Sequence, residues 1–238
     1  MKPPATERRL LALAEEISAC RTCPRLVAWR EQVARDKRRA YRDQTYWGRP
    51  VPGFGDGGAR IVIVGLAPAA HGANRTGRMF TGDRSGDFLY AALHRAGLAS
   101  QPASTARDDG LSLRDVFITA PCRCAPPDNA PTPDELRSCR PWFTRELGML
   151  PRARVFLALG KIGYDALAAA ARETHPRAER PPPFAHGVAT RIGHPTARGE
   201  VWLLASYHVS QQNTQTGRLT PAMFDVVVRR AVELAVAG

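Results

Sequence analysis

The stretch RIVIVGL at residues 60–66 decides the fold, because apolar side chains occupy successive positions in it rather than alternate ones. Runs of the same kind occupy residues 115–120, 154–159 and 201–207. Continuous apolar runs of this length are typical of strands that are covered on both faces. Helical patterns separate the four runs, and this alternation predicts parallel strands joined by right-handed crossovers. We therefore predict an α/β fold: a single domain, residues 1–238, with a central four-stranded parallel sheet flanked by helices.

The helices between these runs have recognisable starts. Thr132 precedes Pro133 and stands three residues before Glu135, so a capping box opens a helix that runs to about Gly148. Thr220 begins the C-terminal helix in the same way. Weaker helical patterns cover residues 7–19, 87–95 and 161–172. Residues 1–50 are thus expected to form a helical N-terminal segment.

The charge balance is strongly basic, with 34 Lys and Arg against 22 Asp and Glu and a net charge of +12. Arginine supplies 31 of the 34 cations, and residues 1–50 hold twelve cations and six acids. Guanidinium groups suit a polyanionic partner, although a general arginine bias would produce the same total. No stretch approaches the ~20 apolar residues that a membrane span requires. We expect a soluble, cytoplasmic protein without a membrane partner.

Polar loops follow three of the four predicted strands. They occupy residues 65–83, 121–129 and 208–218, and each is rich in glycine, proline or amide side chains. Ligands of parallel α/β sheets bind outside the carboxyl ends of the strands. The three loops are therefore expected to form one site.

Five cysteines indicate a second site. Cys20 and Cys23 form a CxxC pair, and fourteen residues separate Cys124 from Cys139, with Cys122 left over. Disulfides are not expected in an intracellular chain, so four thiolates point to Zn²⁺ or an iron–sulfur cluster. Buried free thiols are the alternative, and spacing alone does not separate zinc from iron.

Three motifs make a resemblance recognisable: GLAPA at 65–69, NRTGRMFTGDRSG at 74–86 and HVSQQN at 208–213. They resemble the signatures of family 5, or B-type, uracil-DNA glycosylases, and the cysteines are similar to those of families 4 and 5. The resemblance covers most of the chain. It implies the uracil-DNA glycosylase fold and a DNA repair enzyme that hydrolyses the N-glycosidic bond of a damaged base.

The same resemblance implies a cofactor and partners. In these families four cysteines hold a [4Fe–4S] cluster, with zinc the less favoured alternative here, and the cluster ties the N-terminal segment to the loop after the second strand. The implied partner is double-stranded DNA that carries a damaged base, bound by a monomer associated with the nucleoid. The implied ligands are Cys20, Cys23, Cys124 and Cys139.

At three positions this chain differs from related enzymes, and these differences bear on which damaged bases it excises. The best-known uracil-DNA glycosylases carry a water-activating Asp or Asn where this chain has Ala67, and family 4 places a Glu where it has Leu66. Ala120 stands where family 4 has an Asn that reads the uracil edge. These changes, which also distinguish family 5, imply activity on other deaminated bases such as hypoxanthine.

Three residues are expected to act in catalysis. His208 is placed to donate a hydrogen bond to the departing base, and Asp83 to orient water or stabilise the cationic sugar. Asn129 is a candidate for holding water. The alternatives are a structural histidine at a strand end, a helix cap at Asp83 and an ordinary turn residue at Asn129.

The remaining candidates bind substrate. Phe80 is expected to stack on the extruded base, unless it is a core residue, and Ser210 to hold phosphate. Residues 211–218 resemble the loop that enters the minor groove when the target base leaves the duplex. The full set of expected substrate-binding residues is Gly65, Ala67, Phe80, Ser210, Arg75, Arg78 and Arg218, of which the three arginines would contact phosphate or support the flipped nucleotide.

Three other functions compete with this interpretation. An iron–sulfur electron carrier would leave the polar loops unexplained. A nucleotide-binding or phosphoryl-transfer enzyme is disfavoured because the chain contains no GxxxxGK[ST] loop, and the glycines after residue 64 do not follow GxGxxG. A non-catalytic iron–sulfur protein that binds damaged DNA stays open because of Ala67.

Overall fold

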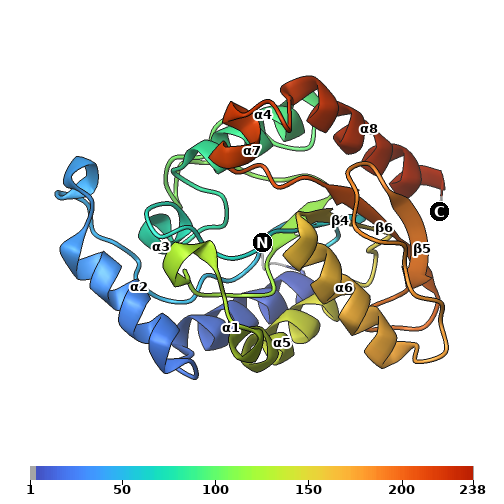
Figure 1. Cartoon of the computed structure of the whole chain (residues 1–238), viewed down its shortest axis with the longest axis horizontal. Helices are drawn as coiled ribbons and strands as arrows, with labels where there is room; N and C mark the ends of the chain where they lie inside the picture. Colours follow the sequence, from blue (N-terminus) through green and yellow to red (C-terminus); the bar gives the residue numbers. More distant parts are fainter. Residues whose placement is uncertain (1–3, 238) are drawn as a thin grey trace.

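One six-stranded sheet organises residues 4–237, which the computed structural model describes (Figure 1). The strand order is β1-β3-β2-β4-β6-β5. The central strands β3, β2, β4 and β6 are parallel, while β1 and β5 pair antiparallel at the edges. The bounds are β1 (Phe54–Gly55), β2 (Ile61–Val64), β3 (Val116–Thr119), β4 (Val155–Leu159), β5 (Ala189–Gly193) and β6 (Glu200–Ser206).

The four predicted parallel strands are confirmed, and the two edge strands were missed. Strand β1 is two residues long, too short to leave a pattern. Strand β5 carries an exposed Arg191 and buries only its last two residues, so it contains no continuous apolar run. The prediction detected strands by burial on both faces, and an edge strand lacks that property.

The helices agree closely with the sequence patterns. The capping box at Thr132 is present, with both reciprocal hydrogen bonds, at the start of α5. Helix α4 begins three residues before the predicted Asp87, because Asp83 caps it. The bounds are α1 (Ala5–Ala19), α2 (Pro24–Asp36), α3 (Ala73–Thr76), α4 (Arg84–Arg95), α5 (Pro133–Leu147), α6 (Lys161–Thr174), α7 (Gln211–Gln215) and α8 (Pro221–Ala237), with 3₁₀ turns η1 (Arg39–Tyr41) and η2 (Pro127–Asn129).

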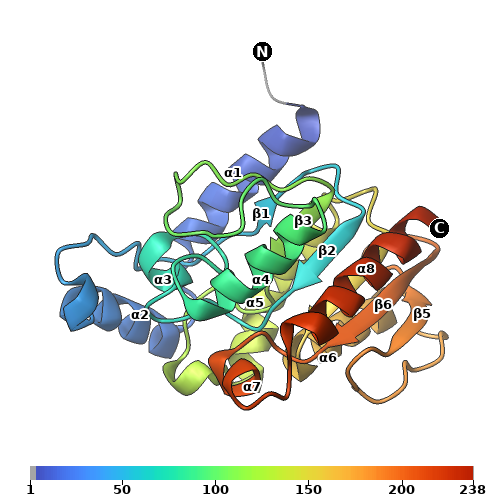
Figure 2. The same cartoon turned by 90° about the horizontal axis from the view of Figure 1, so that it is seen from above.

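Helices cover both faces of the sheet (Figures 1 and 2). On one face, Leu89 and Leu93 of α4 and Phe224 of α8 pack with the strand residues Ile63 and Leu157. On the other face α5 and α6 form a second apolar layer with the alternate strand residues, and α1 packs against α5. No helix within residues 4–237 is long and apolar enough to cross a membrane.

Candidate active site

A cleft of about 610 Å³ lies at the carboxyl ends of the parallel strands. The loops after β2, β3 and β6 all contribute to it, as the sequence predicted. Its walls include seven of the predicted site residues and several other residues. The predicted residues are Gly65, Ala67, Phe80, Asp83, Asn129 and His208; Ser210 joins them from the start of α7.

Phe80 is a wall of this cleft rather than a purely internal residue. It is half-buried and takes a left-handed backbone conformation (φ 51°), which is uncommon for a side chain of this size. A Cβ at Gly65 would come within 2.9 Å of its ring, so Gly65 makes room for the aromatic side chain. The ring centroid lies 6.1 Å from that of His208, with the planes tilted by 34°. The two rings thus face the same space, which suits a planar ligand.

His208 is held neutral at physiological pH. Burial lowers the pKa of its imidazole to about 4, because the charged form loses its hydration. Asn213 donates from Nδ2 to the His208 carbonyl oxygen at 2.8 Å and so fixes the backbone of this loop. A neutral imidazole still offers one N–H, so His208 can donate a hydrogen bond to an oxygen that gains negative charge.

Asp83 caps α4, which was the alternative to a catalytic role, and its side chain also lies at the cleft. Its Oδ1 accepts a hydrogen bond from the Gly86 amide at 3.0 Å and caps α4, while the side chain also lines the cleft. Burial raises the pKa of the carboxyl above its usual range. A Cβ at Gly72 would lie 1.8 Å from Asp83 Oδ2, so only glycine leaves space for the carboxylate there. The cap therefore fixes a carboxylate at the edge of the cleft.

Asn129 and Ser210 lie on different sides of the cleft. Asn129 is exposed, in η2, and follows Asp128; both have positive φ values of 55°. Successive left-handed residues turn the chain sharply and present their side chains outward. Ser210 is the N-cap residue of α7, and its hydroxyl makes no capping bond. Both side chains remain available to a ligand.

The sequence analysis missed several lining residues. Asp128 and Arg84 stand beside the predicted Asn129 and Asp83, and both line the cleft. Both residues are sequence neighbours of predicted site residues, which was the only signal that could have identified them. The left-handed conformation of Asp128 leaves no recognisable pattern in the sequence. Ala69, Ala73, Met79 and Ser85 also line the cleft, and Gln211, Gln212 and Asn213 do so from the segment that was expected to enter the minor groove.

Two predicted phosphate-binding arginines lie inside the protein. Arg75 donates to the carbonyl oxygens of His71 and Gly82 and to Gln44 Oε1. Arg78, 4% exposed, forms an ion pair with Asp109 at 2.7 Å and also donates to Ser104. Their donors are engaged within the fold, so they brace the loop that carries Phe80 and Asp83 rather than reach DNA.

Arg218 is exposed, as the expected phosphate contact requires. Its guanidinium carbon lies 4.5 Å from the ring centroid of Tyr207. The Tyr207 ring also stacks on the His186 ring, with the ring centroids 4.9 Å apart and the ring planes 19° apart. Stacking by its flat face orients Arg218 and leaves the edge donors of the guanidinium free.

The cysteines lie in a separate, small pocket of about 20 Å³ between α2 and α5. Its lining includes all four predicted ligands, Cys20, Cys23, Cys124 and Cys139, and excludes Cys122. The Cys122 thiol instead donates to the Cys124 carbonyl oxygen at 3.3 Å. In residues 4–237 no three His, Cys, Asp or Glu side chains converge tightly enough to hold one metal ion.

A buried arginine points at these thiols. Arg30 is 1% exposed, and its Nη1 donates to Cys124 Sγ at 3.0 Å. Its Nη2 donates to the Cys20 carbonyl oxygen, whereas its Nε has no hydrogen-bond partner among the described residues. The Arg123 amide donates to Cys139 Sγ at 3.3 Å. The pocket thus combines four sulfurs with a buried cation and an N–H donor, a set that suits an anionic sulfur-ligated centre.

Comparison with known proteins identifies the family. The sequence model described as the Uracil DNA glycosylase superfamily matches residues 52–231. A Type-5 uracil-DNA glycosylase from Thermus thermophilus is 55% identical over 227 residues, which cover 94% of this chain and 97% of the relative. One from Mycobacterium bovis is 56% identical over 92% of this chain and 79% of its own length.

More distant similarity extends to a second type. A Type-4 uracil-DNA glycosylase from Pyrobaculum aerophilum is 36% identical over 118 residues, 49% of this chain and 52% of the relative. The match of the superfamily model, residues 52–231, contains all the residues that line the cleft, from Gly65 to Asn213. This chain belongs to the uracil DNA glycosylase superfamily.

Proposed function

We propose that this chain removes uracil from double-stranded DNA by hydrolysing the N-glycosidic bond, which leaves an abasic site. The observation that carries the proposal is the cleft in which the Phe80 ring, the neutral His208 and the Asp83 carboxyl line one space. Relatives named Type-5 uracil-DNA glycosylases align over more than nine-tenths of the chain. We also propose that it acts as a monomer on chromosomal DNA in the cytoplasm.

The reaction develops positive charge on the sugar and negative charge on the departing base. His208 donates its N–H to the base carbonyl oxygen as that oxygen gains charge, and the low pKa of its imidazole keeps it from delivering a full proton. Asp83 supplies negative charge beside the cationic sugar or orients the attacking water. Ala67 has no group that activates water, so electrostatic stabilisation carries most of the rate.

Binding residues complete the proposal. The base leaves the duplex and stacks on Phe80, while Ser210 holds a phosphate and Asn129 holds water. Residues 211–218, which include α7, enter the minor groove and occupy the vacated space, and Arg218 contacts phosphate. Phe80, Ser210 and Asn129 are assigned these roles because they line the cleft, and Arg218 because its side chain is exposed.

A strand-cleavage assay tests the activity. The protein is incubated with a duplex that contains one uracil, and alkali then cuts any abasic site. We expect cleavage at the uracil position and none in a matched thymine duplex. Absence of cleavage with the folded, cofactor-loaded protein would contradict the proposal and favour a DNA-binding protein without catalysis.

We further propose that the cleft accepts deaminated purines such as hypoxanthine. Its floor at the end of β3 is Ala120, whose methyl group cannot select one hydrogen-bonding edge. A site that forms hydrogen bonds to one edge of a base rejects bases whose edge lacks the matching donors and acceptors. An apolar site discriminates less between bases. We expect Ala120→Asn to raise the ratio of uracil to hypoxanthine excision, and an unchanged ratio would contradict this role.

We also propose that Cys20, Cys23, Cys124 and Cys139 hold a [4Fe–4S] cluster. All four line one pocket, and four cysteine thiolates are the usual ligand set of a [4Fe–4S] cluster. When bound, the cluster would serve a structural role, joining the N-terminal segment to the loop after β3. Arg30 fits as a counter-charge for the thiolates.

Matched serine variants test the ligand set. The protein as isolated is expected to be brown, with absorption near ~400 nm and stoichiometric iron. Cys124→Ser should lower the iron content strongly, whereas Cys122→Ser, two residues away and outside the pocket, should keep it. Zinc in a colourless protein, or equal loss from both variants, would contradict the assignment.

A further inference from the structure

We propose that the basic projection, defined as residues 37–44, binds the phosphate backbone of duplex DNA beside the extruded nucleotide. The proposal rests on the proposed glycosylase function and reassigns the phosphate contacts that Arg75 and Arg78 cannot make. The projection follows α2 and contains η1. In Figures 1 and 2 it extends beyond the body of the molecule on the side of α3.

The projection concentrates positive charge at the surface. Lys37, Arg38, Arg39 and Arg42 fall within six residues, and the three arginines are exposed. None of these four side chains forms an ion pair within residues 4–237, whereas Arg21, Arg95, Arg140 and Arg145 each do. Cations held at the surface without acidic partners are free to neutralise phosphates.

Internal contacts fix the projection on the loop that enters the cleft. The Arg75 guanidinium lies 4.0 Å from the centroid of the Tyr41 ring, and its Nη1 donates to Gln44 Oε1 at 2.6 Å. Its Nη2 donates to the Gly82 carbonyl oxygen at 2.6 Å, next to Asp83. One buried arginine therefore joins the projection to the residue that precedes the catalytic carboxylate.

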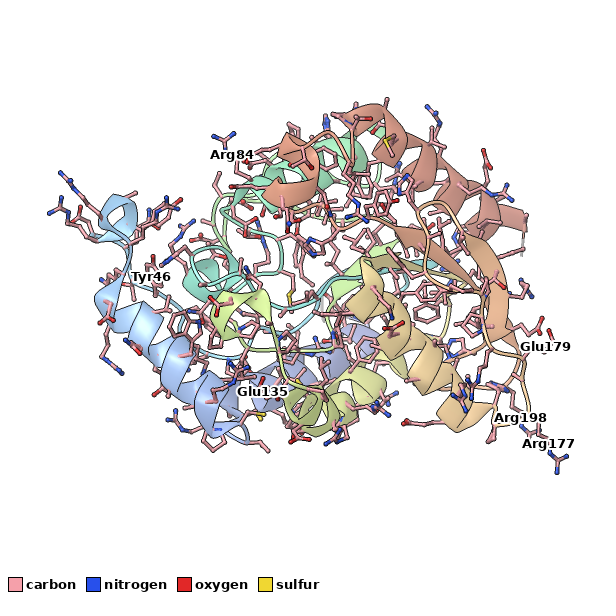
Figure 3. The ribbon with its side chains drawn as sticks, in the orientation of Figure 1. Tyr46, Arg84, Glu135, Arg177, Glu179 and Arg198 are labelled. Atoms are coloured by element: carbon pink, nitrogen blue, oxygen red, sulfur yellow. The ribbon has the colours of Figure 1, made fainter. Side chains whose placement is uncertain are left out.

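A second connection lies just after the projection. The Tyr46 hydroxyl is 3.1 Å from His71 Nδ1, and it accepts a hydrogen bond from the Arg38 amide at 3.3 Å. His71 precedes Gly72, which packs against Asp83. Figure 3 shows Tyr46 between the projection and α3.

Because these contacts fix the projection beside the cleft, its position determines which phosphates of the duplex it can bind. A base can enter the cleft only from a duplex that lies across the carboxyl ends of the strands. The projection lies at one end of this edge of the sheet. Its contacts would fall on phosphates to one side of the lesion, independent of sequence. Each phosphate neutralised in B-DNA adds about 0.9 to the slope of log K against log salt.

The experiment compares two double variants with the same loss of charge. Arg39→Gln/Arg42→Gln alters the projection, and Arg177→Gln/Arg198→Gln alters exposed residues at the opposite end of the molecule (Figure 3). Binding to an undamaged duplex and to one with a stable abasic-site analogue is followed by fluorescence anisotropy over a range of salt concentrations. Single-turnover uracil excision is measured at saturating DNA.

We expect the projection variant to lose about one to two units of salt slope on both duplexes, and the control variant to match the wild type. Shortening the duplex on one side of the lesion should remove the difference between projection variant and wild type; shortening the other side should not. The excision rate at saturating DNA should stay unchanged.

Equal slopes for the two double variants would overturn the proposal, because net charge alone would then explain binding. A wild type that binds DNA with the expected slope but excises no uracil would instead overturn the glycosylase function and leave the projection's role intact. The two failures are therefore distinguishable.

Discussion

The cleft and the cysteine pocket lie close together but differ in construction. Both use the segment after β3, since Ala120 lines the cleft and Cys124 lines the pocket. Ala67 lines the cleft and also packs against Cys122 and Cys124. The cleft is open at about 610 Å³ and carries polar groups, whereas the pocket encloses about 20 Å³ between sulfurs. Under the proposed function, the cleft performs the chemistry and the pocket maintains the fold around it.

The largest effect on the chemical step is expected at His208. Replacing it by alanine removes the donor to the departing base, and we expect single-turnover uracil excision to slow by about 10²–10³-fold. Substrate binding should change little. His94→Ala, on the exposed face of α4, is the control and should keep the wild-type rate. A His208→Ala rate within a few-fold of wild type would leave that residue a structural one.

Asp83 is expected to rank second. Asparagine is as good an N-cap as aspartate but carries no charge, so Asp83→Asn separates the two roles. We expect excision to slow by about 10–10²-fold while the free energy of unfolding stays within ~0.5 kcal/mol of wild type. Asp83→Ala should also lose about 1 kcal/mol of stability. If Asp83→Asn is fully active, the carboxylate only caps α4.

The pH dependence of kcat/KM provides a further test of Asp83. Burial raises the pKa of this carboxyl, so the active carboxylate is lost as pH falls through that raised value. The His208 imidazole, with its pKa lowered to about 4, stays neutral above that pH and adds no acid limb there. We expect an acid limb in the wild type that is absent from Asp83→Asn. Its persistence there would assign the limb to another group.

Gly72→Ala should have an intermediate effect of about tenfold on excision, because its Cβ would overlap Asp83 Oδ2 and displace the carboxylate. Gly57→Ala is the matched control, since its Cβ would meet side-chain atoms no closer than 3.3 Å. The excision rate at saturating DNA distinguishes them. Equal rates for both variants would show that the position of Asp83 does not limit the reaction.

The smallest effect on the chemical step is expected in the pocket. Arg30→Met removes the cation beside Cys124, and we expect the free energy of unfolding to fall by about 3–5 kcal/mol while the fully loaded enzyme excises uracil within ~3-fold of wild type. Arg21→Gln, which removes an exposed cation next to Cys20, should change stability by less than ~1 kcal/mol. If Arg30→Met slowed the chemical step as much as His208→Ala, the cleft and the cysteine pocket would not differ in their contribution to catalysis.

Burial explains which parts of the structure the sequence predicted. The four central strands are covered on both faces and leave continuous apolar runs, whereas β5 is partly exposed and leaves none. Phe80, Asp83 and His208 were found because they follow strand ends within motifs. Arg75 and Arg78 look like surface cations in sequence, but partners distant in the chain, Gln44 and Asp109, bury them. Charge is visible in a sequence, and long-range pairing is not.

The most direct measurement of the central claim is the release of free base in a single turnover. A uracil-containing duplex is incubated with excess wild-type protein and with the Asp83→Asn/His208→Ala variant, and free uracil is quantified by mass spectrometry. We predict one uracil per duplex from the wild type, and binding without release from the double variant. Release by the double variant at the wild-type rate, or none by the wild type, would contradict the assignment of the chemistry to this cleft.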